Sequence, residues 1–109
     1  MLVNVRSMMH MVSLSVPFLK KTAAQKGGAS ITILTSAQGN KPDPKSPVMS
    51  TAAAMVQMLI KVTALETAFF GVRVNGVATG VINTQFDPDA KNIPPRMKQD
   101  LMAMEFTAE

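Results

Sequence analysis

Apolar residues recur every three or four positions in two long stretches of the chain, which is the pattern of a helix with a buried face. The first stretch runs from Leu2 to about Lys21. Its core-facing positions are Leu2, Val5, Met9, Val12, Val16 and Leu19. Further apolar positions that widen this face are Met8, Met11 and Leu14. We therefore expect a helix covered on more than one side, bent near Pro17, which removes a backbone hydrogen bond, and ended by Gly27-Gly28.

The second stretch, Met49 to Phe70, carries two apolar faces. The first comprises Met49, Ala52, Ala53, Val56, Leu59, Ile60, Thr63 and Ala64. The second comprises Met55, Met58, Val62 and Leu65. A helix that is apolar on two sides is expected to pack on its own sheet and also against a neighbour.

Two short β-branched segments alternate with these helices. Ser30 to Thr35 reads as a buried strand between glycine-containing segments, and Val72 to Ala78 reads as a second strand. Gly71 suits the left-handed position that ends the preceding helix. The loop Ser36–Pro47 between the first strand and the second helix is rich in proline, so we expect it to be extended or mobile.

After the second strand, the sequence predicts a loop to about Pro95 and a final amphipathic helix over Arg96–Glu105. The order of elements is therefore α-β-α-β-loop-α, in one α/β domain over residues 1–109. Crossover connections imply parallel strands in a right-handed βαβ unit. A sheet of only two parallel strands leaves its edges and much of its faces uncovered. Such a chain is expected to associate through its edge, or to be partly ordered when alone.

Composition narrows the candidate chemistry of the 109-residue chain. It has no cysteine, and His10 is its one histidine, which leaves a poor ligand set for zinc. The net charge is +4, but the chain has no Tyr or Trp to stack on bases, so nucleic acid is an unfavoured partner. The opening lacks the features of a signal peptide, and no apolar run reaches the roughly 20 residues that span a bilayer. A soluble intracellular protein is expected.

The stretch Ala64 to Phe86 reads ALETAFFGVRVNGVATGVINTQF. It resembles the second half of short-chain dehydrogenase/reductases, whose A-x-E-x-A-x-x-G-I-R-V-N-x-V-x-P-G-x-x-x-T joins the active-site helix to the nicotinamide loop. The resemblance covers residues 1–86 and leaves 87–109 as a loop and C-terminal helix. It implies part of a Rossmann-like, doubly wound parallel sheet. The family's T-G-x-x-x-G-x-G pyrophosphate motif has no counterpart here.

By this resemblance, Ser36 stands at the position of the family's substrate-binding Ser, and Asn4 at that of the Asn that orders a water. The family also uses a Tyr, which transfers the proton, and a Lys four residues later, which lowers the pKa of that Tyr. An alignment without gaps places Met49 at the Tyr position and Ala53 at the Lys position. An alternative alignment, with a two-residue insertion, places Pro47 and Thr51 there. Neither alignment restores the proton relay.

The cofactor loop also departs from the family pattern. Thr79-Gly80 replaces the Pro-Gly that follows the strand, whereas Val81, Ile82 and Thr84 remain where the family contacts the nicotinamide. The resemblance implies NAD or NADP as cofactor. Without the pyrophosphate motif, binding by the lone chain is expected to be weak or absent.

Structural roles compete with these functional ones. Ser36 at a strand end is also a typical turn or cap residue, Asn4 could satisfy buried backbone groups, and the hydroxyl of Thr84 could bond within its own loop. His10 is expected to be a packed surface residue.

Two functions from different classes follow. One is an inactive structural or interaction protein that forms homo- or hetero-oligomers through residues 2–21 and 49–70. The alternative is an NAD(P)-dependent oxidoreductase of carbonyls or alcohols, as a truncated record of a longer enzyme or with a partner that supplies the missing half. Nucleic-acid binding through the basic loops is a third hypothesis, and it predicts affinity that falls with added salt.

Overall fold

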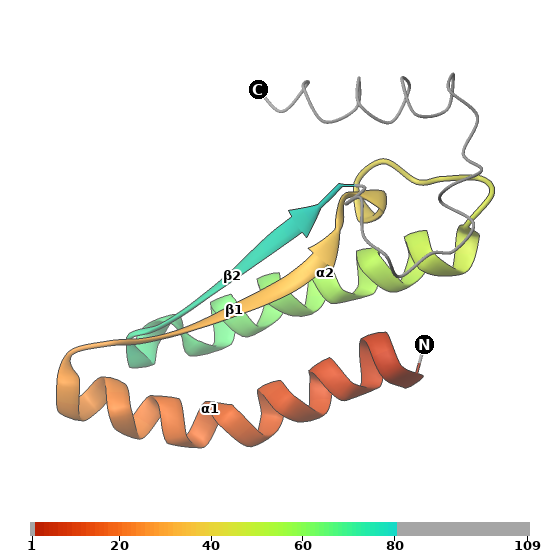
Figure 1. The fold of residues 1–109 in the computed structure, drawn as a ribbon. Coiled ribbons are helices and arrows are strands. Elements are labelled where there is room, and N and C mark those ends of the chain that lie inside the picture. Colours follow the sequence, from red (N-terminus) through yellow and green to blue (C-terminus); the bar gives the residue numbers. More distant parts are fainter. Residues whose placement is uncertain (1, 81–109) are drawn as a thin grey trace, which may run out of the picture. The chain divides into compact units, whose positions relative to one another are not determined.

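The computed structural model describes residues 2–80 (Figure 1). The chain divides into two compact units, residues 1–78 and 79–109, and the first contains almost all of the described structure. The elements in chain order are a π-helical segment (Leu2–Arg6), α1 (Ser7–Lys26), β1 (Ala29–Ser36), the 3-10 helix η2 (Ala37–Gly39), α2 (Pro47–Thr67), the 3-10 helix η3 (Ala68–Phe70) and β2 (Val72–Thr79). This α-β-α-β order confirms the predicted α/β fold class. The loop after the second strand and the helix expected over Arg96–Glu105 lie outside the described residues.

Two glycines end the helical segments. Gly27 follows α1 with φ 81°, and its N–H donates to the carbonyl of Ala23 at 2.9 Å. Gly71 follows η3 with φ 74°, and its N–H donates to the carbonyl of Ala68 at 3.0 Å. Both conformations are left-handed, which costs glycine little because it has no Cβ. The first helix continues beyond the predicted end near Lys21 to Lys26, and Gly27 then ends it.

The two strands pair in parallel, as the sequence predicted (Figure 1). The N–H of Ala29, at the start of β1, donates to the carbonyl of Gly71, immediately before β2, at 3.2 Å. The amino ends of the two strands therefore lie side by side. Further along, a Cβ built on Gly76 would lie 3.8 Å from the carbonyl oxygen of Ile33, so Gly76 and Ile33 are near neighbours across the pair.

One face of this sheet carries the core. Residues from both helices and both strands form it: Val5, Val12, Ile33, Ala52, Val56, Ile60 and Val74. Gly76 lets α2 approach the sheet closely, since a Cβ there would lie 2.6 Å from Cδ1 of Ile60. Within residues 2–80 the opposite face is bare: Leu34 is 65% exposed and Val77 is 47% exposed.

The helix faces agree with the sequence patterns in part. Val5 and Val12 are buried on the predicted face of the first helix, but the prediction was wrong for Met9, which is 49% exposed. On α2 the predicted core face is buried or half-buried except at Met49, which is 52% exposed. Met49 lies in the first turn of α2, at the end of its stripe, whereas the spacing of the first helix does not explain the exposure of Met9. The second stripe of α2 is apolar, and its four residues are exposed in the described unit.

Among the described residues, one helical segment, Pro47–Phe70, is long and apolar enough to cross a membrane, with a mean hydropathy of 1.6 over its most apolar window. The sequence contains no uninterrupted apolar run of that length there, because Lys61 and Glu66 interrupt it. A core helix of a soluble protein meets the same criterion, and α2 packs on the sheet. The absence of a membrane span therefore stays a prediction.

Candidate functional site

Ser36 is the last residue of β1 and forms the N-cap of η2. Its Oγ accepts a hydrogen bond from the backbone N–H of Gln38 at 3.2 Å. Its carbonyl oxygen accepts from Nε2 of Gln57, on α2, at 2.9 Å. Gly39 leaves room for the Gln57 amide, because a Cβ on Gly39 would lie 2.6 Å from Nε2. Ser36 thus has a local structural role at the point where β1 meets the helix layer.

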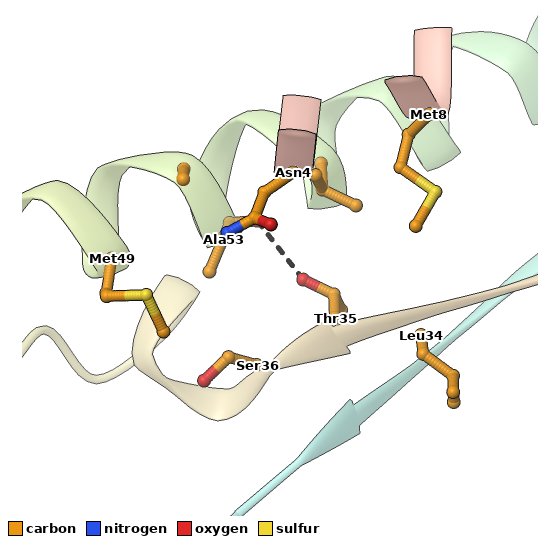
Figure 2. Close-up of a pocket in the computed structure, with 9 residues that line it drawn as sticks. Asn4, Met8, Leu34, Thr35, Ser36, Met49 and Ala53 are labelled. Carbon is orange, nitrogen blue, oxygen red and sulfur yellow. Dashed lines mark hydrogen bonds between the residues drawn. The ribbon is translucent and has the colours of Figure 1, made fainter. Parts of the chain in front are cut away.

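An open pocket of about 200 Å³ lies at this end of β1 (Figure 2). It is bounded by the π-helical segment and α1, the carboxyl end of β1, and the first half of α2. The residues that line it are Asn4, Met8, Leu34, Thr35, Ser36, Met49, Ala52, Ala53 and Val56. The structure therefore brings together Asn4 and Ser36 with Met49 and Ala53, which the gapless alignment places at the Tyr and Lys positions.

Of the two alignments, the gapless one has both of its positions in the wall of this pocket. Pro47 and Thr51 do not line the pocket. Thr51 is exposed, and its hydroxyl donates to the carbonyl of Pro47 at 2.8 Å within the helix.

The pocket wall is mostly apolar. Asn4, Thr35 and Ser36 are the three lining residues whose side chains carry nitrogen or oxygen. The hydroxyl of Thr35 donates to the carbonyl of Ala53 at 3.4 Å (Figure 2). The thioether of Met49 and the methyl group of Ala53 carry no exchangeable proton. The pocket can therefore hold an apolar group, whereas neither of these side chains can transfer a proton.

The sequence analysis missed Met8, Leu34 and Thr35 as lining residues. A helical signal for Met8 was present, since it lies one turn from Asn4 and therefore shares its face. Leu34 and Thr35 directly precede Ser36 at the strand end. The expected cofactor contacts Val81, Ile82 and Thr84 lie outside the described residues.

A second, shallow hollow of about 510 Å³ lies near the amino ends of the strands. It is lined mainly by small residues, including Gly27, Gly28 and Gly71, with Arg73 and Asn75 as its polar side chains. It contains none of the site residues that the sequence predicted.

The βαβ unit agrees with the family comparison. The model of the short chain dehydrogenase family matches residues 1–93. Since this match covers most of the chain, the chain belongs to the short-chain dehydrogenase family, and its fold is a partial Rossmann-like unit. Proteins of this family are typically soluble and bind NAD(P). None of the curated proteins compared with the chain matches it.

Proposed function

We propose that this protein is a catalytically impaired member of the short-chain dehydrogenase family that acts by binding protein partners. The observation that carries the proposal is the pairing of Met49 and Ala53 in the pocket beside Ser36. In the family these two positions hold the proton-transferring Tyr and its Lys. A thioether and a methyl group can do neither task.

The helices supply the surface for such binding. An exposed stripe on α2 and the adjoining η3, called here the α2 stripe, is spaced by alternating steps of three and four residues: Met55, Met58, Val62, Leu65 and Phe69. Leu65 is 82% exposed and Phe69 is 92% exposed. On α1, Met11, Leu14 and Phe18 form a shorter exposed stripe. Contiguous apolar surface of this kind is typical of protein interfaces.

The spacing of the α2 stripe suits a second copy of the chain. The positions are arranged almost symmetrically about Val62, so two antiparallel helices can each present the same stripe to the other. We therefore place the homo- or hetero-oligomer contact on residues 2–21 and 49–70, with a second copy as the first partner to test.

One observation supports the alternative function. Asn4 and Ser36, the two family site residues that the chain retains, still line one pocket. An oxidoreductase would in addition need a nucleotide-binding half, from a partner or a longer chain, and another proton donor.

Calorimetry with NADH and NADPH, with light scattering on the same sample, distinguishes the two functions. The proposal expects a folded oligomer that neither binds cofactor nor reduces carbonyl compounds. Saturable cofactor binding, with turnover that is lost in Ser36→Ala, would favour the oxidoreductase. A monomer that is compact and folded at micromolar concentration would contradict the interaction role.

A further inference from the structure

All of the sulfur in the chain belongs to methionine. The 109 residues include ten methionines and no cysteine. Thiol oxidation is therefore not available to this chain, whereas a thioether can be oxidised to a sulfoxide. The exposure of the sulfur decides which methionines an oxidant reaches. In the part of the chain that the structure describes, the exposed methionines are Met9, Met11, Met49, Met55 and Met58.

Two of these exposed methionines are neighbours on the α2 stripe. Met55 is 46% exposed and Met58 is 57% exposed. Residues three positions apart on a helix lie on the same face, so both thioethers belong to one surface. They form the amino-terminal part of the stripe. A second copy that packs antiparallel along the whole stripe would therefore cover both sulfur atoms.

Oxidation makes these two side chains polar. A peroxide transfers one oxygen atom to the thioether sulfur, which becomes a sulfoxide, and hydrogen peroxide is reduced to water. The sulfoxide oxygen is a hydrogen-bond acceptor, whereas the thioether is a weak one. The side chains of the α2 stripe carry no N–H or O–H group to bond with that oxygen. Two stripes in contact would therefore bury the sulfoxide oxygens without a partner, which opposes association.

We propose that Met55 and Met58 are a site of reversible oxidation by peroxides, and that their sulfoxides separate self-associated copies of the chain. This inference rests on the proposed function, because it requires a second copy on the α2 stripe. Reversal requires a thiol-dependent sulfoxide reductase, in which two thiols are oxidised to a disulfide and the oxygen leaves as water. The chain has no thiol of its own, so the reductase is a separate protein.

Association should in turn protect the two sulfur atoms. They are open to solvent in the single chain and covered when a second copy lies on the stripe. Raising the protein concentration from far below to far above the dissociation constant should therefore slow their oxidation about tenfold, because few single chains remain. Met9 is 49% exposed and belongs to neither the α2 stripe nor the pocket, so its oxidation rate should stay constant.

The experiment treats the full 109-residue chain with dilute hydrogen peroxide and locates the sulfoxides by peptide mass spectrometry. Analytical ultracentrifugation should show self-association weakened at least tenfold, with unchanged helix content in circular dichroism. A variant with both Met55→Leu and Met58→Leu keeps the apolar volume, so it should associate like the native chain and remain associated after treatment. Met9→Leu is the matched control, since it removes a sulfur of similar exposure elsewhere and should leave the response to peroxide unchanged.

The outcomes separate this inference from the proposed function. A monomeric untreated chain would contradict self-association and the inference together. An untreated chain that associates, and still associates with Met55 and Met58 oxidised, would overturn the inference alone. Equal loss of association in the double leucine variant, or a fall in helix content on oxidation, would also overturn it. Incubation of the oxidised chain with a methionine sulfoxide reductase and dithiothreitol should restore association, and continued separation after reduction would contradict reversibility.

Discussion

At the scale of single residues, two apolar side chains limit the chemistry of the pocket. Met49 and Ala53 lie one helical turn apart on α2, so both reach the same pocket. In the family this spacing lets a Lys act on a Tyr. At the two positions that the gapless alignment assigns to this pair, Met49 and Ala53 carry neither charge nor an acidic proton, and they form part of a mostly apolar wall.

The buried hydroxyl of Thr67 stabilises the junction of α2 and β2. It is 0% exposed, and its hydroxyl lies 2.8 Å from the carbonyl of Thr63 and 3.1 Å from that of Val72. Thr67→Val should lower the free energy of unfolding by about 1–2 kcal/mol, because a buried carbonyl loses its partner. The control is Thr51→Val, which removes an exposed bond of the same kind and should change little. Equal effects in urea titrations would contradict this role.

A substitution at Gly71 tests how much the left-handed turn between η3 and β2 depends on glycine. Its φ is 74°, and a Cβ there would meet nothing closer than the Ala23 Cβ at 3.9 Å. The cost of Gly71→Ala is therefore conformational, about 1 kcal/mol of unfolding free energy. Gly28→Ala is the matched control, since Gly28 does not have positive φ and a Cβ there would lie 3.8 Å from the carbonyl oxygen of Gly71. A thermal melt that shifts equally for both variants would show that the left-handed turn is not the cause.

At the scale of elements, α2 carries two apolar faces, of which one is buried against the sheet and the other is exposed in the described unit. One face packs on the sheet through residues such as Ala52, Val56 and Ile60. The α2 stripe faces away from them and is exposed in the described unit. Retaining an ordered apolar stripe on an exposed face is explained most simply by a partner that covers it.

Leu65→Glu tests that explanation. A carboxylate buried in an apolar contact has no partner, so we expect self-association to weaken at least tenfold, as measured by analytical ultracentrifugation. Lys61→Glu is the control, because Lys61 is exposed about a quarter turn from Val62 and lies beside the stripe. If both variants remain associated, the contact lies elsewhere on the chain.

At the scale of the whole molecule, the described unit is a sheet with helices on one face only. A layer of helix on sheet buries one side of each element, and the other side needs a second layer or a partner. Short chains also bury a smaller share of their surface on folding than large ones do. Association is therefore expected to contribute part of the stability of the native state.

The midpoint of thermal unfolding should consequently rise with protein concentration. For a partner that binds only the folded chain, a hundredfold excess over its dissociation constant contributes about 2.7 kcal/mol. Differential scanning calorimetry over a hundredfold range of concentration checks this, with Leu65→Glu as the variant whose midpoint should stay constant. A constant midpoint for the native chain would show that it is stable alone.

The sequence by itself determined the elements and the lack of Tyr. The β-branched runs, Gly27 and Gly71 act locally, so the strands and helix ends could be placed within a few residues, and the absence of Tyr needs no structure. Only the tertiary structure decided which residues of α2 line the pocket and that Met9 and Met49 are exposed. The physical reason is that backbone propensity depends on neighbours along the chain, whereas burial depends on which surfaces meet across the sheet.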